Sequence, residues 1–363
     1  MLLMQILSFY IIKRFLSILF YASFAFIAIF IIVDLIERLD DFLAQDAAWI
    51  QLVYYYIYYI PFIIILTLPI NTLLSTLFSI GIMAQHNEII ACKAAGISLY
   101  RITFPILMLG LVISVLSGLA SETIVPHTNK LRLDIWRYEI RKEKKNLLNK
   151  RNRLALQDGK NRQIYIGFYD SAKKKGTQIN VVWINQNGIE KRWDAKSMEW
   201  KEERSGWLFT DVVERAFTDS TEKVTYIDTL WYTETKIYPD DLVELETKPE
   251  EMNYAELNRF VDRMTNIGAD ARKWLVGLYM KVSYPFANFI IVLFGAPLAS
   301  RKRRSGPAIG FAIALMVSFI YFLFLRTGQV LGHKGDLNPW IAAWIGNIVF
   351  GIGGIFAMLK VRK

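Results

Sequence analysis

Long apolar runs occupy both ends of the chain, and a charged, polar stretch separates them. Three runs lie near the start and three near the end, at 15–33, 50–85, 102–121, 282–300, 305–325 and 337–359. A helix needs about 20 apolar residues to cross the hydrocarbon core of a membrane. The pattern therefore predicts six transmembrane helices, three on each side of a water-exposed domain.

Two of these runs need comment. The run 50–85 is longer than one crossing requires and contains Pro61 and Pro69. Because proline removes a helix hydrogen bond and the excess length must be absorbed, we expect a kinked or tilted helix. The first run exceeds the apolar core of a cleaved signal peptide and is interpreted as a permanent helix.

Lysine and arginine are distributed unevenly around the apolar runs. Acidic residues dominate after the first run, where Asp34, Glu37, Asp40, Asp41 and Asp46 accompany only Arg38. Because basic residues favour the cytoplasmic side, both termini are predicted to be cytoplasmic and the central domain to lie outside. The basic residues that all fall on one side are Lys13, Arg14, Lys93, Arg101, Arg301, Lys302, Arg303, Arg304, Lys360, Arg362 and Lys363.

The central stretch, 127–270, has a different pattern. Its first part, to about residue 150, is compatible with a charged helix, and alternating runs rich in β-branched and aromatic residues follow at 163–169, 179–185, 207–217 and 224–232. Asn187-Gly188 and Ser205-Gly206 are turn signals. We expect a sandwich or jelly-roll-like stack of sheets. An amphipathic connector helix at 250–266 is predicted from Met252, Leu257, Phe260, Val261 and Met264.

The predicted fold class is thus an α+β membrane protein with a periplasmic β-jelly-roll-like domain inserted between two sets of three helices. The expected domains are residues 1–126, 127–270 and 271–363. Composition agrees, since the chain of 363 residues is 53% hydrophobic and has a mean hydropathy of +0.27.

Charge and reactive residues exclude several other classes. Much of the net charge of +10 lies beside the apolar runs, which accounts for it without nucleic acid. Cys92 is the single cysteine, so the exported domain can have no internal disulfide. The three histidines are scattered, and neither a metal site nor a catalytic cluster is predicted.

The segment 85–101, between the second and third runs, is too polar for the membrane and too apolar for a free linker. Ile89, Ile90, Ala94 and Ile97 recur at roughly helical spacing, and Gly96 is a natural helix end. A short cytoplasmic helix of this kind could dock into a groove of a motor subunit, or it could be an interfacial helix that only caps the bundle.

This segment resembles the coupling segment of the LptF/LptG lipopolysaccharide-export permeases, through Glu88-Ile89-Ile90 and Ala95-Gly96-Ile97-Ser98. The order of three helices, a periplasmic jelly roll and three helices also matches that family. Pro126 and the segments 281–285 and 331–344 are similar too, and the last is closer to LptG than to LptF.

The resemblance implies a permease subunit of an ABC exporter in the inner membrane of a Gram-negative bacterium. Such a permease extracts lipopolysaccharide and passes it to a periplasmic LptC/LptA-like bridge, together with a second, LptF-like permease. An LptB-like ATPase dimer would supply the energy. The chain lacks a G-x-x-x-x-G-K-[ST] phosphate loop, so we expect no ATPase site and no cofactor of its own.

Two groups of residues are candidates for these roles. For coupling to the ATPase they are Glu88, Lys93, Ala95 and Gly96, although Gly96 fits equally well as a helix cap. For lipopolysaccharide they are Lys130, Arg132, Arg137, Lys281 and Arg326, with Arg272 and Lys273 nearby. Snorkelling or pairing with an acid is the alternative for Lys281 and Arg326, and a position in water or among lipid headgroups is the alternative for the others.

One departure from the resemblance concerns the outer end of the first helix, which is basic in LptG members and thought to meet lipid phosphates there. In this chain Asp34, Glu37, Asp40 and Asp41 stand at that end. The contacts with an anionic glycolipid are therefore expected elsewhere, or from the partner permease.

Two further classes stay open: a secondary transporter and a non-transporting scaffold. The uncharged runs contain no carboxylate of the kind that a proton or sodium relay uses, which disfavours the secondary transporter. A scaffold would not need the cytoplasmic helix.

Overall fold

The computed structural model describes residues 2–142, 150–159, 161–185, 188–218, 221–235, 237–239, 242, 249–266, 270–300 and 307–360. The chain forms two compact units, one helical (Met1–Ile135 with Arg272–Lys363) and one sheet-rich (Trp136–Ala271). Each unit is presented by itself.

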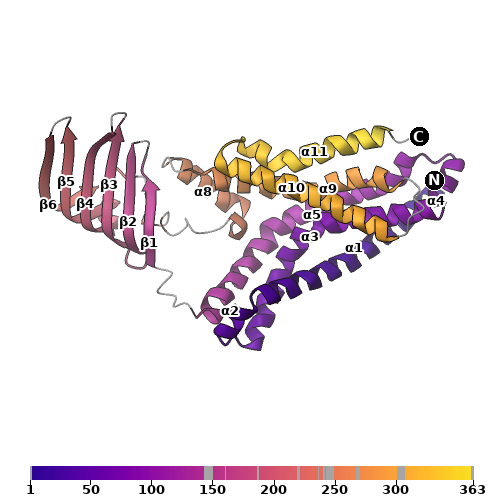
Figure 1. The fold of residues 1–363 in the computed structure, drawn as a ribbon, viewed down its shortest axis with the longest axis horizontal. Coiled ribbons are helices and arrows are strands. Elements are labelled where there is room, and N and C mark those ends of the chain that lie inside the picture. The colour runs from indigo at the N-terminus through magenta and orange to yellow at the C-terminus, as the bar shows by residue number, and fades with distance from the viewer. Residues whose placement is uncertain are drawn as a thin grey trace. The chain divides into compact units, whose positions relative to one another are not determined.

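The helical unit consists of long helices that follow the apolar runs of the sequence (Figure 1). Six of its helices are long and apolar enough to cross a membrane, which confirms the six predicted transmembrane helices. Its helices are α1 (Leu2–Glu37), α2 (Leu39–Ala44), α3 (Trp49–Gln85), α4 (Glu88–Ala94), α5 (Leu99–Asp134), α9 (Arg272–Ala299), α10 (Pro307–Lys334) and α11 (Pro339–Lys360).

Several of these helices extend beyond the apolar run that predicted them. The predicted third run, 102–121, is only the apolar part of α5, which continues through Pro126 and into a π-helix at Ile135–Ile140. At about 1.5 Å per residue, a helix of 36 residues is far longer than the roughly 30 Å hydrocarbon core. The charged residues that end the hydropathy signal therefore continue the same helix.

Helix α3 passes through both of its prolines without ending. Proline at position 69 cannot donate to the preceding turn, so a carbonyl there needs another donor. The hydroxyl of Tyr284 on α9 donates to the carbonyl of Leu66 at 2.7 Å, three residues before Pro69. The carbonyl that Pro69 leaves without its helix donor is that of Ile65, four residues earlier, so Tyr284 bonds the adjacent carbonyl and ties α9 to α3 beside the proline.

Helix α9 lies at the centre of the unit and packs against α3, α5, α10 and α11. Small residues allow close approach, since a Cβ on Gly295 would lie 2.7 Å from Leu73. Polar bonds join three helices: Tyr321 donates to Asn347, and Asn347 donates to the carbonyl of Ser283 at 2.6 Å. Close packing and hydrogen bonds are what hold helices together in a membrane.

The sheet-rich unit contains one antiparallel sheet in which each strand pairs with the next in sequence. A helix, α8 (Tyr254–Asn266), follows the sheet. In the sequence, the sheet follows one set of apolar helices and precedes another, which confirms the α+β fold class. The strands are β1 (Lys150–Gln157), β2 (Arg162–Asp170), β3 (Lys175–Asn185), β4 (Gly188–Lys201), β5 (Gly206–Thr218) and β6 (Thr221–Tyr232).

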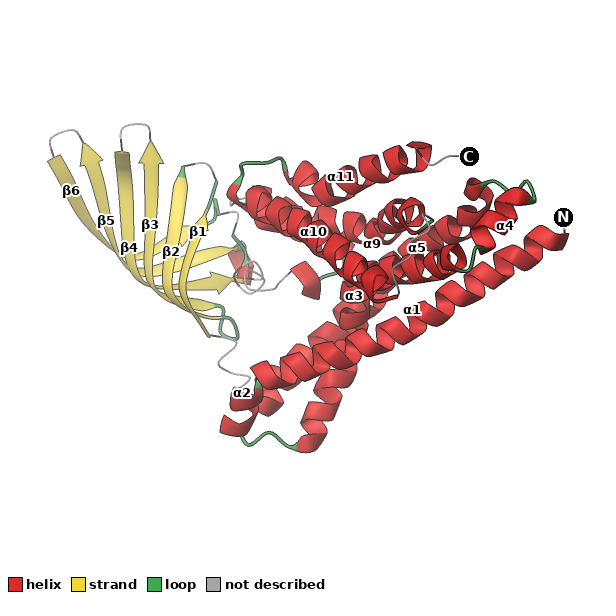
Figure 2. Ribbon diagram, turned by 45° about the vertical axis from the view of Figure 1, so that its right-hand side comes forward, coloured by secondary structure: helices red, strands yellow, loops and turns green. Residues whose placement is uncertain are grey.

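All six described strands belong to one antiparallel meander. This sheet is the inserted sheet domain of the predicted fold class. The reason for the meander order is local, because short connections between consecutive strands bring sequence neighbours together as antiparallel pairs. Figure 2 shows that the strands bend along their length, so this one sheet curves strongly.

A line of unpaired positions crosses the whole sheet. Pairing skips residues 153, 167, 178, 196, 211 and 228 on the six strands in turn. Gln178 and Asp211 have positive φ angles of 57° and 53°. A Cβ on Gly167 would lie 2.8 Å from the Cβ of Gln178, so only glycine fits opposite it.

The sheet unit buries its own apolar face. Trp193, Trp200, Trp207 and Phe209 belong to one buried cluster with side chains of the other strands. The segment after β6 covers part of this cluster, since Ile237 is 2% exposed and its carbonyl accepts from Trp207 Nε1 at 2.9 Å. At the two edge strands, the Tyr232 hydroxyl donates to Asp158, which is completely buried.

All four predicted strand segments lie within observed strands, and Ser205 has the left-handed conformation of its predicted turn. Strands β1 and β4 were not predicted. The predicted amphipathic segment 250–266 corresponds to a 3-10 helix at Pro249–Glu251 and to α8, and its five apolar residues are buried. Asn187 lies outside the described residues.

Candidate functional site

The short helix α4 lies between α3 and α5 in the sequence, as predicted, and ends at Ala94, two residues before Gly96. Gly96 has a φ of +79° and donates to the carbonyl of Lys93 at 3.0 Å. The next amide, that of Ile97, donates to the carbonyl of Cys92 at 2.9 Å. These two bonds form a Schellman motif, which closes the helix and requires a left-handed residue at Gly96.

The two faces of this segment have different surroundings. Ile89 is 4% exposed, and Cys92 and Ile97 pack against the bundle core. On the opposite face, Ile90 is 53% exposed, and the small residues Ala91, Ala94, Ala95 and Gly96 are exposed with it. We call these five residues the outer face of α4. Of the predicted coupling residues, Ala95 and Gly96 lie on this face, and Lys93 is half-buried.

Glu88, the first residue of α4, is directed toward the chain itself. Its Oε1 accepts a long hydrogen bond of 3.5 Å from the hydroxyl of Tyr10 and lies 4.0 Å from Nη1 of Arg14, both on α1. The Nδ1 of His86 lies 3.8 Å from the same Oε1 atom. Glu88 therefore has partners within its own chain. Its expected role as a charged contact with a motor subunit stays a prediction.

Lys281 is paired with an acid, which is the alternative that the sequence left open for this residue. Its Nζ donates to Oε1 of Glu122 at 3.1 Å, joining α9 to α5, and its side chain is only 10% exposed. A lysine so deeply placed needs a counter-charge, because desolvating an unpaired ammonium is costly. Its contact with lipopolysaccharide stays a prediction.

Arg132 on α5 is held by aromatic rings. Its guanidinium carbon lies 4.1 Å from the ring centre of Tyr59 and 5.6 Å from that of Tyr55, both on α3. Such stacking stabilises the cation without neutralising it. Its Nε atom is buried and has no hydrogen-bond partner within the described part of the chain.

Arg38, in contrast, is neutralised. Its Nε donates to Asp34 at 3.0 Å, and Tyr56 donates to the other oxygen of the same carboxylate at 3.2 Å. The acidic character at the end of α1 therefore has a structural use: Asp34, 8% exposed, fixes Arg38 and ties α1 to α3.

The remaining basic candidates differ in their surroundings. Lys130 and Arg326 are exposed, and Arg326 donates to Gln329 at 2.9 Å on its own helix. Arg272 donates to the carbonyl of Lys334 at 3.0 Å, and Arg137 belongs to the sheet-rich unit. Residues 301–304, assigned to topology, lie outside the described residues.

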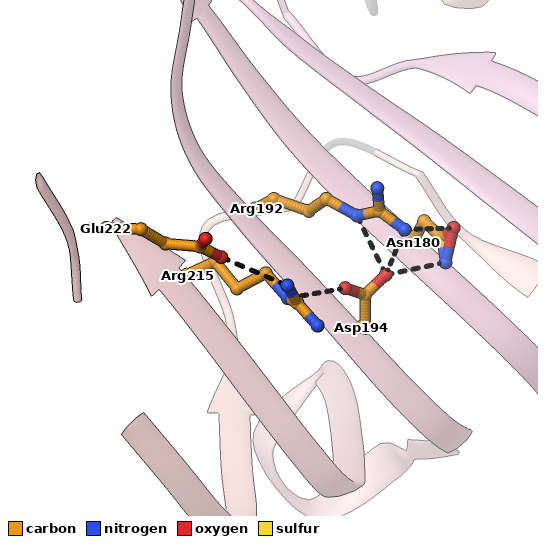
Figure 3. Close-up of polar contacts among 5 residues, drawn as sticks. All are labelled: Asn180, Arg192, Asp194, Arg215 and Glu222. Carbon is orange, nitrogen blue, oxygen red and sulfur yellow. Dashed lines mark hydrogen bonds and ion pairs between the residues drawn. The ribbon is translucent and has the colours of Figure 1, made fainter. Parts of the chain in front are cut away.

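One face of the sheet carries a charged network across four strands (Figure 3). Asp194 accepts from Arg192 at 2.6 Å and from Asn180 at 2.9 Å, and it lies 3.5 Å from Arg215, which bonds Glu222 at 3.0 Å. Two guanidinium groups face two carboxylates. Because the network is electrically balanced, we interpret it as a tie between strands and not as an anion-binding surface.

Comparison with known proteins places this architecture in a family. Residues 9–360 match the family described as the lipopolysaccharide export system permease LptF/LptG. The chain belongs to the LptF/LptG permease family. Two similar curated proteins are named lipopolysaccharide export system permease protein LptG, from Haemophilus influenzae and Escherichia coli K12. Each is 20% identical over 80% of this chain, covering 76% and 81% of the relative respectively.

Membership of the LptF/LptG family confirms the resemblance found in the sequence. It makes the chain a lipopolysaccharide export permease, that is, a transport subunit and not a catalytic enzyme. Together with the six candidate spans, it also makes the chain a multi-pass inner-membrane protein. Among the residues that the structure describes, no group of acidic, histidine or cysteine side chains could hold a metal ion.

Sequence reasoning missed the partners of the candidate residues in this LptF/LptG permease. Tyr10 and Arg14 are 78 and 74 positions from Glu88, and Glu122 is 159 positions from Lys281. A signal was present at Glu122, since it is an acid directly after the apolar part of the third run. No comparable signal distinguished Tyr10 from the other aromatic residues of α1.

Proposed function

We propose that this permease is one of two membrane subunits of an ABC exporter that moves lipopolysaccharide out of the inner membrane. In this proposal a separate ATPase dimer drives transport, a second permease completes the path, and a periplasmic bridge receives the lipid. The observation that carries the proposal is the short α4 helix, whose outer face is exposed, in a chain of the LptF/LptG family.

The outer face of α4 is suited to dock on a motor subunit. It presents one exposed isoleucine, Ile90, among small residues, so a partner groove could approach the backbone closely. The Schellman motif at Gly96 holds the face in a fixed shape, which reduces the entropy lost on docking. Ala95 and Gly96 therefore belong to the proposed contact directly, and Lys93 borders it.

The proposed cargo is an anionic glycolipid, which requires cations at the outer leaflet. Arg132 is the best supported of the predicted contacts, because aromatic rings position its charge without an acid partner in the described residues. Lys281 would have to exchange Glu122 for a phosphate, whereas Lys130 and Arg326 are already exposed. Arg137 would act from the sheet-rich unit.

The proposed orientation places both termini and α4 in the cytoplasm and the sheet-rich unit in the periplasm. The basic residues beside the apolar runs support it. The described edges of the sheet, β1 and β6, offer unpaired backbone groups to which a bridge protein could add a strand.

Purification from the native membrane tests this function. A tagged wild-type chain is expected to bring down an ABC ATPase and a second six-helix permease, identified by mass spectrometry. Ala94→Arg, which places a charge on the outer face of α4, is expected to lose the ATPase and keep the second permease, whereas Ala94→Ser retains both. A wild-type chain that brings down no ATPase contradicts the exporter and favours a secondary transporter or a scaffold.

A further inference from the structure

We propose that Glu88, Tyr10 and Arg14 form an internal link that transmits movement of α4 to α1 during transport. Tyr10 and Arg14 are then positioning residues for coupling, and Glu88 acts through them and not only through a motor subunit. This inference rests on the proposed function, because movement of α4 requires an ATPase docked on its outer face.

The link is built from three contacts among the Tyr10 hydroxyl, the Arg14 guanidinium and one carboxylate oxygen of Glu88. Arg14 Nη1 donates to the hydroxyl of Tyr10 at 2.8 Å, and that hydroxyl lies 3.5 Å from Glu88 Oε1. The same guanidinium nitrogen lies 4.0 Å from the same carboxylate oxygen. The tyrosine hydroxyl is thus both acceptor and donor, and it connects the two charged groups.

The position of Glu88 makes the link mechanically direct. It is the first residue of α4, so a tilt or shift of this helix moves the carboxylate with the backbone. The Schellman motif at the other end of α4 fixes the segment as one body. A displacement of the outer face of α4 therefore moves the Glu88 carboxylate against Tyr10 and Arg14, which are one helical turn apart on α1.

Helix α1 is suited to receive such a pull. Only 6% of its apolar span is buried inside the structure, against 72% for α3. It packs along α3 and α5, and its far end is tied to α3 by the bond from Tyr56 to Asp34. A helix with so little buried surface can change position at a lower cost in packing than α3 can.

Basic side chains surround the Glu88 carboxylate. Side chains of Glu88 and Arg14 are 33% and 23% exposed, so water screens their attraction only in part. His86 approaches from the segment before α4 and adds a second cation when it is protonated. Lys13, next to Arg14 on α1, is exposed and provides a control with the same charge.

The test uses the complete complex purified from native membranes and reconstituted in liposomes. Two quantities are measured: the amount of ATPase that co-purifies, and the lipopolysaccharide released per ATP hydrolysed. Arg14→Gln is expected to keep the ATPase bound and to lower the transport per ATP at least about fivefold. Lys13→Gln is expected to change neither quantity.

Two more variants keep the test decisive if Arg14→Gln is misfolded. Tyr10→Phe removes only the bridging hydroxyl and is expected to lower transport per ATP in the same direction. Exchanging the charges, Arg14→Glu with Glu88→Arg, is expected to recover at least about half of the coupling that Glu88→Arg loses, since the attraction between the two positions is restored.

The inference is overturned if Arg14→Gln and Tyr10→Phe transport as much per ATP as the wild type, or if the exchange is no better than Glu88→Arg alone. In those outcomes wild-type transport continues, so the proposed function stands. A wild-type complex without an ATPase or without ATP-dependent release overturns the proposed function and this link together.

Discussion

The sheet-rich unit and the helical unit treat their apolar side chains in opposite ways. In the sheet-rich unit, aromatic residues such as Trp207 and Phe209 are buried against one another and against the chain's own return segment. In the helical unit, large apolar residues such as Phe20, Phe24 and Phe319 are each at least 69% exposed. One unit completes its core within the chain, and the other leaves apolar surface for lipid or another subunit.

This difference shows which interactions each unit depends on. The sheet-rich unit is stabilised in water by burial of apolar area. Lipid tails are as apolar as the helices, so the bundle depends on close packing and polar bonds instead, as at Gly295 and Asn347. Substitutions should therefore separate the two units by the kind of change to which each is sensitive.

The largest expected effect breaks the sheet core. Trp207→Ala removes a side chain that is 2% exposed, together with its bond to Ile237. A loss of about 3–5 kcal/mol in the free energy of unfolding of the sheet-rich unit is expected. Near-UV circular dichroism during chemical unfolding measures it, with Tyr226→Ala, at an 80% exposed position, expected to change stability by less than about 0.5 kcal/mol. Equal losses in the two variants would contradict a self-contained core.

Gly328→Ala tests the close packing of the bundle. A Cβ at this position would lie 2.7 Å from Ile345 and even closer to the carbonyl oxygen of Ala342, so α10 and α11 must separate. Overpacking of this kind costs about 1–3 kcal/mol, seen as a lower unfolding temperature in detergent. Gly310→Ala on the same helix, where a Cβ meets nothing within 4 Å, is the control and should be neutral or stabilising. A bundle indifferent to Gly328→Ala would not be held by close packing.

A smaller effect is expected at the end of α4. Gly96→Ala meets no neighbour within 4 Å, so its cost is the left-handed backbone alone, about 1 kcal/mol. This loosens the Schellman motif and is expected to raise hydrogen exchange of the amides of Gly96 and Ile97 severalfold while both units stay folded. Exchange unchanged from the wild type would show that the motif does not hold the segment.

The smallest expected effect is a pH dependence confined to the sheet-rich unit. Burial raises the pKa of the Glu214 carboxyl, but hydrogen bonds from Lys191 and Trp193 outweigh it and hold the pKa below its ordinary value. The stability from this group is therefore present above the unfolded-state pKa, roughly 4.3, and is lost as the pH falls through the folded-state pKa.

Glu214→Gln should accordingly flatten the loss of thermal stability between about pH 5 and pH 3. Glu190→Gln, at an exposed carboxyl on β4, should leave the slope as in the wild type. A slope that is the same in all three proteins would remove Glu214 from the acid sensitivity of the sheet.

The sequence predicts the long helices because an uncharged apolar run of about 20 residues is typical of a membrane-spanning helix. It predicts the helix end at Gly96 because glycine is common after a helix, and it predicts α8 from the amphipathic spacing of its apolar residues. Strand β4 was missed because charged residues lie on both of its faces, where Lys191 pairs with Glu214 at 2.7 Å and Arg192 with Asp194. Charged residues paired in this way, within the strand or across to the next one, hide the alternation that identifies a strand.

The site was less predictable than the fold. The helix α4 and its end before Gly96 follow from the local sequence, but the separation of Ile89 from Ile90, and the partners of Glu88 and Lys281, depend on how the bundle packs. The order of the strands was not predicted either, since strand number and alternation do not determine which strands pair. Contacts between side chains on different helices carry little signal in a single sequence.

The central claim is that this helical unit is half of an ATP-driven path for lipopolysaccharide. Release of lipopolysaccharide from liposomes that contain the purified complex, to a soluble acceptor with and without ATP, tests it most directly. The account predicts release that requires ATP and is reduced by Ala94→Arg but not by Ala94→Ser. Release that proceeds equally without ATP, or a complex that releases none when its ATPase is active, would contradict it.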